Sequence, residues 1–254
     1  MGNIVRKVKF CFDCDDTLYD LSEPFARTLH KHYPDAEWDP DEFAEMYTSY
    51  RGYGDEVFEQ LQDGRLSVNE AGIIRAMRVM GGWNLPVYPA EPVFFQQDYV
   101  DFQQNIYMPQ PLKDYFKESQ AELAVITNGN NEHQRRKCER LGVFDYFPKD
   151  HVFTSGELGV SKPEADCFKR AFERMGEDLR DWYYIGDNYI NDMEGAKAAG
   201  MKTIHFNRHY GPEGPAADYV VYTDEELAAL LRRLEKEALH EDSADTSAGE
   251  SGAL

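Results

Sequence analysis

The chain has 254 residues, a length that one α/β domain with an inserted subdomain commonly occupies. Its 42% hydrophobic and 29% charged residues are typical of a globular protein and exclude wholesale disorder or a fibrous repeat. The 27 Lys and Arg against 47 Asp and Glu give a net charge of −20, which repels nucleic acid polymers and anionic membrane surfaces. A small phosphate ester stays compatible with this charge, because a bound cation and a few aimed donors outweigh distant charges that salt screens over about 10 Å.

The N-terminal residues 1–8 reach Arg6 and Lys7 before any apolar run develops. They therefore lack the apolar core of a signal peptide. No later segment approaches the roughly 18 to 20 apolar residues that a membrane-spanning helix requires. We expect a cytoplasmic protein with no membrane partner.

The four cysteines are few for this length, which favours a reducing compartment over a disulfide scaffold. They are Cys11, Cys14, Cys138 and Cys167. Cys11 and Cys14 form a C-x-x-C pair at the end of an apolar run. A zinc ribbon needs a second such pair, and residues three apart in a strand point to opposite faces. A redox or metal-binding role for this pair is therefore the less favoured alternative.

Five short segments, the first of them apolar only in its second half, have the composition of buried strands in a parallel sheet. They cover residues 4–12, 123–126, 151–153, 182–185 and 203–206. Segments with helical spacing lie between them, at residues 131–141, 164–175 and 191–199. Gly142, Gly176 and Gly200 follow these segments at C-cap positions. The alternation predicts an α/β fold, a Rossmann-like doubly wound parallel sheet.

Residues 20–105 are expected to form an all-helical cap domain inserted into this core. The segment lacks β-branched runs and repeats the signals that begin helices, an N-cap residue with Glu three positions later or Pro in the first turn. These starts are Ser22-Glu23-Pro24, Asp39-Pro40-Asp41-Glu42, Ser67-Val68-Asn69-Glu70 and Ala90-Glu91-Pro92. The insert divides the core into residues 1–19 and 106–240.

The last helix of the core is predicted to begin after Thr223 and to end near His240. Residues 241–254 are small, polar and acidic, and we expect them to form a disordered tail.

Four segments rich in polar side chains lie at the predicted carboxyl ends of strands or at helix starts, where an open parallel sheet places its ligand crevice. They are Asp13-Cys14-Asp15-Asp16-Thr17, Thr127-Asn128-Gly129, Ser161-Lys162-Pro163 and Gly186-Asp187-Asn188 with Asp192. Three carboxylates within four residues are costly against a buried strand unless a cation or a reaction uses them. Each of the other segments, taken singly, is equally well explained as a capping turn or an exposed loop.

Together and in this order, the four segments resemble the haloacid dehalogenase-like hydrolase superfamily. Its motifs are D-x-D-x-T after the first strand, a Ser or Thr after the second, a later Lys and a final acidic pair. The resemblance covers residues 5–207 and includes the helical insert of members with a C1-type cap. Residues 126–129, 156–163 and 207–211 are most similar to pyrimidine 5′-nucleotidase and phosphoglycolate phosphatase members.

The resemblance implies roles for the acidic residues. Asp13 would be the nucleophile that forms an aspartyl-phosphate, and Asp15 would serve as general acid and then general base. The Asp13 and Asp187 carboxylates and the Asp15 main-chain carbonyl would hold Mg²⁺. Asp192 would support the metal ligands or the motif lysine from the second coordination sphere.

The remaining motif residues would bind the phosphoryl group, since the resemblance gives Thr127 and Lys162 its oxygens and adds the backbone N–H of Asn128. In the cap, Tyr50 or Tyr53 could stack on a base and Arg51 could meet a second anionic group. Core packing or surface exposure is the favoured alternative for each of these three cap residues.

The function implied is a Mg²⁺-dependent phosphomonoester hydrolase acting on a small phosphorylated metabolite, with a nucleoside 5′-monophosphate favoured, as a monomer or homodimer. The dehalogenases of the superfamily lack the second aspartate of the first motif, whereas Asp15 is present here. An alkoxide needs a proton to leave and a halide does not, so Asp15 favours phosphate chemistry. A phosphomutase of the same fold and a catalytically idle binding protein remain as alternatives.

Overall fold

The computed structural model describes residues 7–57, 60 and 63–250. The chain divides into two compact units, one made of Met1–Asp20 and Tyr107–Leu254 and the other of Leu21–Ile106. The first unit contains the sheet and the motif residues, and the second is helical. The predicted fold class, a Rossmann-like parallel sheet with an inserted helical cap, is confirmed.

The sheet has six strands in the order β3-β2-β1-β4-β5-β6, and every neighbouring pair is parallel. Their bounds are β1(Lys9–Phe12), β2(Glu122–Thr127), β3(Val152–Thr154), β4(Trp182–Gly186), β5(Lys202–Phe206) and β6(Tyr219–Val221). The sequence predicts the first five. It misses β6 because this edge strand has three residues, only one of them buried, which is too short for a periodic pattern. Part of the predicted first strand, residues 4–6, lies outside the described residues.

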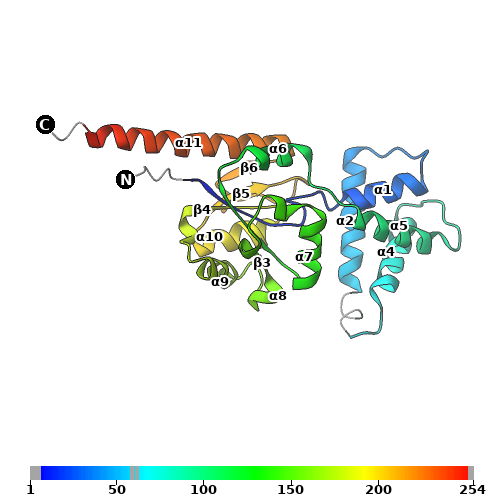
Figure 1. The fold of residues 1–254 in the computed structure, drawn as a ribbon. Helices are drawn as coiled ribbons and strands as arrows, with labels where there is room; N and C mark the ends of the chain where they lie inside the picture. Colours follow the sequence, from blue (N-terminus) through cyan, green and yellow to red (C-terminus); the bar gives the residue numbers. More distant parts are fainter. Residues whose placement is uncertain (1–6, 58–59, 61–62, 251–254) are drawn as a thin grey trace. The chain divides into compact units, whose positions relative to one another are not determined.

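Alternating side chains of the strands fill the two faces of the sheet, each covered by its own helices (Figure 1). On one face, Cys11 and Tyr184 belong to a buried cluster with Phe168 of α9(Ala165–Met175) and Ala196 of α10(Gly195–Ala199). On the other face, the ring of Phe12 lies 5.4 Å from that of Phe116 in α6(Gln110–Glu118). This two-sided burial explains why the strands are apolar throughout.

The remaining short elements of this unit connect the strands. They are α7(Asn131–Arg140), α8(Ser155–Leu158), η1(Val143–Asp145), η2(Lys149–His151), η3(Leu179–Asp181) and η4(Tyr189–Glu194). Gly142, Gly176 and Gly200 have φ of 70°, 70° and 103°, so the predicted glycine C-caps are confirmed. The predicted helix over 191–199 is instead a π-helical turn, η4, that leads into α10.

The last helix, α11(Asp224–Glu250), is longer than the sequence predicts. Thr223 begins it, since its hydroxyl accepts a hydrogen bond from Glu226 N at 3.2 Å. No glycine or proline interrupts residues 224–248. The backbone of residues 241–250, which the sequence predicts to be disordered, is therefore helical, and residues 251–254 lie outside the described residues.

The second unit packs helices whose starts match the predicted signals. They are α1(Glu23–His32), α2(Pro40–Glu56), α4(Val68–Gly82) and α5(Glu91–Gln104). Ser67 forms the predicted capping box, because Glu70 N donates to Ser67 Oγ and Ser67 N donates to Glu70 Oε2 at 2.8 Å. Tyr50 is fully buried in the core of this unit, its ring 4.5 Å from that of Phe25. The favoured alternative of core packing is confirmed for Tyr50.

Among the described residues, no helix combines the length and the apolar character that crossing a membrane requires.

Replacing Ser67 by Ala is expected to reduce the free energy of unfolding by about 1 kcal/mol, because the backbone N–H of Glu70 at the start of α4 loses its acceptor, the Ser67 hydroxyl. Urea unfolding followed by circular dichroism measures this change. The matched control is Ser49→Ala in the middle of α2, where Ala is the better helix former and the change should stay within about 0.5 kcal/mol. Equal effects of the two substitutions would contradict a capping role.

Candidate active site

The polar residues that the sequence singles out gather at one edge of the sheet. Asp13 follows β1, Thr127 ends β2 and Asp187 follows β4, and these three strands are neighbours in the sheet. The register pairs Phe12 with both Val125 and Ile185, so the strands end at the same level. Asp13 N continues this pairing by donating to Ile185 O at 2.8 Å.

Lys162 reaches this edge from the loop before α9, and its side chain is 3% exposed. Its ammonium donates to Asp13 Oδ1 at 2.7 Å, to Asp192 Oδ1 at 2.6 Å and to the Tyr184 hydroxyl at 2.9 Å. The Tyr184 hydroxyl in turn donates to Ile126 O at 2.8 Å. All three donor positions of the ammonium are thus used, and Lys162 has one fixed place between two carboxylates.

The main chain of Lys162 is fixed by Asn128, the residue after β2. The Asn128 side chain donates to Lys162 O at 3.0 Å and accepts from Lys162 N at 2.9 Å. This reciprocal pair ties the loop to the strand end. The side chain of Asn128 therefore has a positioning function that the sequence does not predict.

Asp192 is held as firmly on the other side of the ammonium. Its second oxygen accepts from Asn188 N at 2.9 Å. Gly186, at the end of β4, leaves it space, since a Cβ at this position would lie 2.4 Å from Asp192 Cγ. A glycine is required here by the close approach of the carboxylate to the strand.

The acidic groups at this edge outnumber the cation that faces them. Carboxylate oxygens of Asp13, Asp187 and Asp192 lie within 4.8 Å of one another. Burial raises the pKa of Asp13 to about 7, with Lys162 acting against it and Asp192 adding to it. Burial, with Asp192 and Asp13, raises the pKa of Asp187 well above its ordinary value. Hard oxygen donors with an excess of negative charge are what a divalent cation such as Mg²⁺ prefers, so the donor set fits it.

Lys162 compensates the buried carboxylates. Burial alone would lower the pKa of its ammonium, but Asp13 and Asp192 raise it, so the charged form is the stable one. The buried ion pair is therefore a local requirement of the folded state.

The carboxylate of Asp15 lies apart from this group. Lys137 and Gln134 of α7 and the hydroxyl of Tyr19 donate to it. Burial alone would raise the pKa of Asp15, but Lys137, Tyr19 and Gln134 together lower it. The sequence does not predict these three partners. The available signal is the spacing of Gln134 and Lys137, three residues apart on the helix that follows the Thr127 turn.

All four cysteines are buried and free. The thiol of Cys14 shares a hydrogen bond with Cys138 rather than with Cys11. The C-x-x-C pair therefore forms no joint site in the described part of the chain, with Cys11 in β1 and Cys14 in the turn that follows it.

A second acidic group lies beside the first motif. His209 Nε2 is 3.2 Å from Asp16 Oδ1 and 3.8 Å from Asp20 Oδ1. Asp16 belongs to the acidic cluster predicted from the sequence, but its histidine partner is not predicted.

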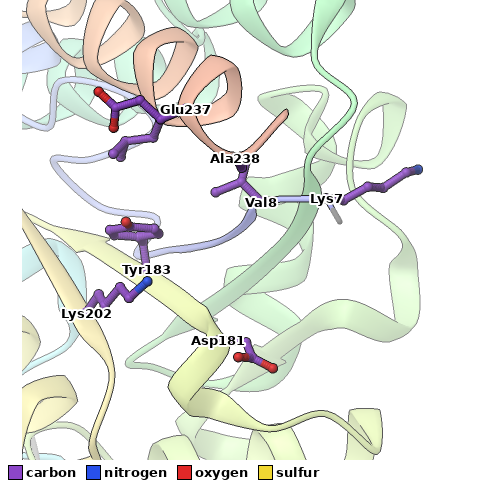
Figure 2. Close-up of a pocket in the computed structure, with 8 residues that line it drawn as sticks. Lys7, Val8, Asp181, Tyr183, Lys202, Glu237 and Ala238 are labelled. Atoms are coloured by element: carbon purple, nitrogen blue, oxygen red, sulfur yellow. The ribbon is translucent and has the colours of Figure 1, made fainter. Parts of the chain in front are cut away.

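A small pocket lies at the opposite ends of the strands (Figure 2). It has a volume of about 160 Å³ and lies between the starts of β4 and β5 and the face of α11. Lys202 contributes its ammonium 4.8 Å from the ring centre of Tyr183, and Glu237 comes from α11. None of the predicted motif residues lines this pocket.

Replacing Lys162 by Met is expected to reduce the free energy of unfolding by about 3–5 kcal/mol, because it leaves buried carboxylates without their cation. The loss should shrink as the pH falls from about 8 to about 6, since carboxyls whose pKa burial raises take up protons in the folded state. Urea unfolding at several pH values tests both points. The control is Lys169→Met, whose side chain is 50% exposed, and a loss in Lys162→Met no larger than in this control would contradict the assignment.

Comparisons with known proteins agree with this geometry. The sequence pattern of the family described as haloacid dehalogenase-like hydrolase matches residues 10–200. The chain is 34% identical over 118 residues to a glyceraldehyde 3-phosphate phosphatase of Methanocaldococcus jannaschii, covering 45% of this chain and 51% of that protein. It is 37% identical over 114 residues to the pyrimidine 5′-nucleotidase YjjG of Escherichia coli (strain K12), covering 44% and 50%. The chain thus spans about half the length of these two relatives.

Solved structures share the fold at low sequence identity. A HAD-hydrolase of Bacillus subtilis, YfnB, superposes with a TM-score of 0.59 at 23% identity, over 89% of this chain and 99% of that chain. The L-2-haloacid dehalogenase of Xanthobacter autotrophicus superposes with a TM-score of 0.56 at 17% identity, over 89% and 99%. On the match to residues 10–200 and this fold, the chain belongs to the haloacid dehalogenase-like hydrolase family.

Proposed function

We propose that the chain is a Mg²⁺-dependent phosphomonoester hydrolase that acts on a small phosphorylated metabolite through an aspartyl-phosphate. A nucleoside 5′-monophosphate is the favoured substrate class. The observation that carries this proposal is the buried contact of 2.7 Å between Asp13 and Lys162. It orients a carboxylate that is a suitable nucleophile and places a cation where phosphoryl oxygens would lie. The four free cysteines support a cytoplasmic setting.

In the first half of the proposed reaction, an oxygen of Asp13 attacks phosphorus and the bond from phosphorus to the leaving oxygen breaks. Asp15, which takes up a proton from solvent against the lowering of its pKa by Lys137, gives this proton to that oxygen. In the second half, Asp15 takes a proton from water, the water oxygen attacks phosphorus, and the bond to Asp13 breaks. Inorganic phosphate leaves and both carboxyls return to their starting states.

The other motif residues hold the phosphoryl group during both halves. Thr127 binds its oxygens, Lys162 exchanges one of its three present contacts for a phosphoryl oxygen, and the backbone N–H of Asn128 adds a donor. Asp13, Asp187 and the main-chain carbonyl of Asp15 would hold Mg²⁺, with Asp192 supporting this shell. When bound, the cation neutralises charge on the carboxylate and phosphate oxygens.

The presence of Asp15 favours phosphate esters over carbon–halogen bonds. A halide leaves without a proton, whereas an alkoxide requires one, so a carboxyl two residues after the nucleophile serves only the ester reaction. The named phosphatase and nucleotidase relatives support the same choice. The two relatives are named for different substrates, glyceraldehyde 3-phosphate and a pyrimidine nucleotide. The nucleotide preference therefore rests on the match to YjjG and on the resemblance of residues 126–129, 156–163 and 207–211.

The test is release of inorganic phosphate across nucleoside monophosphates, sugar phosphates and phosphoglycolate, with Mg²⁺ present or chelated. Release from the nucleotides above all others supports the full proposal. A phosphomutase would need a bisphosphate activator and release no phosphate. An idle binding protein would be inert with any metal ion.

Replacing Asp13 by Asn is expected to abolish phosphate release, because an amide does not form the acyl phosphate bond, while the fold is retained. Phosphate release and circular dichroism measure the two effects. Asp114→Asn on α6, a half-exposed carboxylate, is the matched control and should keep the wild-type rate. Wild-type turnover in Asp13→Asn would show that another group is the nucleophile.

Chelation is expected to stop turnover reversibly, and added Mg²⁺ should restore it. A second readout is independent of turnover, since binding to the folded state raises the unfolding temperature. Mg²⁺ should raise it in the wild type, and Asp187→Asn should reduce this shift because a carboxylate of the acidic group is lost. Full activity in excess chelator would exclude the metal requirement.

A further inference from the structure

The carboxylate of Asp15 is surrounded by donors that belong to none of the four motifs. Oδ1 accepts from the Tyr19 hydroxyl at 2.5 Å and from Lys137 Nζ at 2.5 Å. Oδ2 accepts from Lys137 Nζ at 2.8 Å and from Gln134 Nε2 at 3.2 Å. The two oxygens are therefore held unequally, with the shorter contacts on Oδ1.

Lys137 is the charged member of this set and is largely removed from solvent, with 12% of its side chain exposed. Burial alone would lower the pKa of its ammonium, but Asp15 outweighs this and raises it. Burying a cation is costly unless a carboxylate pairs with it, and Asp15 pairs with Lys137 through both oxygens. The pair is thus a partly buried contact with a defined geometry, unlike a surface ion pair.

The first turns of α7 are arranged so that its side chains reach Asp15. Gln134 and Lys137 lie one turn apart on the same face of the helix. Gln134 Nε2 also donates to Asn128 O at 2.8 Å, which ties the helix to the end of β2. Gly129 leaves the necessary space, since a Cβ there would lie 2.7 Å from Gln134 Nε2.

Gln134 has a second polar atom whose hydrogen-bonding capacity is unused. Its Oε1 is buried and has no hydrogen-bond partner within the part of the chain that the structure describes. An acceptor left without a donor in a buried place is costly, and an ordered water would satisfy it. This acceptor belongs to the same side chain that contacts Oδ2 of Asp15.

We propose that Lys137 is a positioning residue that fixes the direction of the Asp15 carboxylate, so that Oδ2 faces the leaving oxygen while Oδ1 stays anchored. The inference rests on the proposed function, in which Asp15 exchanges a proton with the leaving group. In the first half, Oδ2 carries the proton, its two longer contacts with Lys137 and Gln134 open, and the proton passes to the leaving oxygen as the ester bond breaks. In the second half, Oδ2 takes a proton back from the attacking water. Oδ1 keeps its contacts with Lys137 and Tyr19 throughout.

Without Lys137 the direction of Asp15 is no longer determined. Asp13 and Asp16 are neighbouring carboxyls that repel it, and 28% of its side chain already faces solvent. The hydrogen bonds from Tyr19 and Gln134 are neutral and supply no opposing charge. A displacement of about 1 Å suffices to impair proton transfer to a bound substrate.

The experiment compares kcat/KM of wild type and Lys137→Met on an alkyl phosphate and on 4-nitrophenyl phosphate. Nitrophenolate leaves without a proton, whereas an alkoxide requires one. General acid catalysis contributes about 10²–10⁴-fold, so we expect a loss of about 10²-fold or more on the alkyl ester and of less than about threefold on the aryl ester. The ratio kcat/KM reports the half-reaction in which the leaving group departs. KM should change little.

Three further variants make the result decisive. Lys137→Arg restores a cation that can grip both oxygens and should recover most of the lost rate on the alkyl ester. Lys117→Met removes a lysine of an exposed Lys–Asp pair on α6 and should leave both rates unchanged. Lys137→Gln, which keeps a donor without the charge, replaces the Met variant if that protein fails to fold, and should show the same selective loss.

Two outcomes would overturn the inference: an equal loss on both esters, which indicates a general structural role, or no loss on either. The variant Asp15→Asn distinguishes a failure of the inference about Lys137 from a failure of the proposed function. If wild type releases no phosphate, or if Asp15→Asn shows no leaving-group dependence, the proposed function fails first. A crystal structure of Lys137→Met gives a readout without turnover, and an Asp15 still held by Tyr19 and Gln134 would also overturn the inference.

Discussion

The contact of one buried ammonium with two carboxylates is the constraint on which this edge of the sheet depends. Lys162 lies between Asp13 and Asp192, and the Tyr184 hydroxyl accepts the third hydrogen bond of its ammonium. Each partner requires a further arrangement of the chain. Asn128 fixes the loop that carries Lys162, and Gly186 leaves room for Asp192. The burial of these charges is costly, so the folded state requires the surrounding hydrogen bonds that compensate this cost.

The parallel sheet explains how residues so far apart in the chain come to share this contact. Neighbouring strands β2, β1 and β4 end at one level, and each is followed by a polar turn. The strands are buried on both faces, so polar side chains have no place along them and gather at their ends. The same principle places α7 after β2, and its first turns deliver Gln134 and Lys137 to the turn after β1.

Sequence reasoning predicts much of this because local signals and the tertiary structure agree. Five strands, the glycine C-caps and the capping box at Ser67 follow from short patterns. The partners of Asp15 do not follow from such patterns. In the sequence, Lys137 on a polar helix resembles any exposed lysine, and only the fold brings it into contact with Asp15, which lies 122 positions earlier in the chain. The length of α11 is also missed, because an acidic composition indicates a lack of core contacts but does not prevent a helical backbone. Motif residues are predictable from their spacing in the sequence. The residues that orient the motif side chains are determined by tertiary packing and are not predictable in this way.

The division of the two first-motif carboxylates between two lysines has a chemical consequence. Asp13 meets Lys162 together with Asp192 and near Asp187, so the cation there is outnumbered and the pKa of Asp13 is raised by burial. Asp15 meets Lys137 with two neutral donors, and its pKa is lowered. Two chemically identical side chains, two residues apart, therefore have opposite electrostatic surroundings. The first retains an excess of negative charge that a divalent cation offsets, while the second has its charge balanced by protein alone and needs only a fixed direction. The two carboxylates are therefore not interchangeable, because Asp13 faces the acidic group beside Lys162 whereas Asp15 faces Lys137.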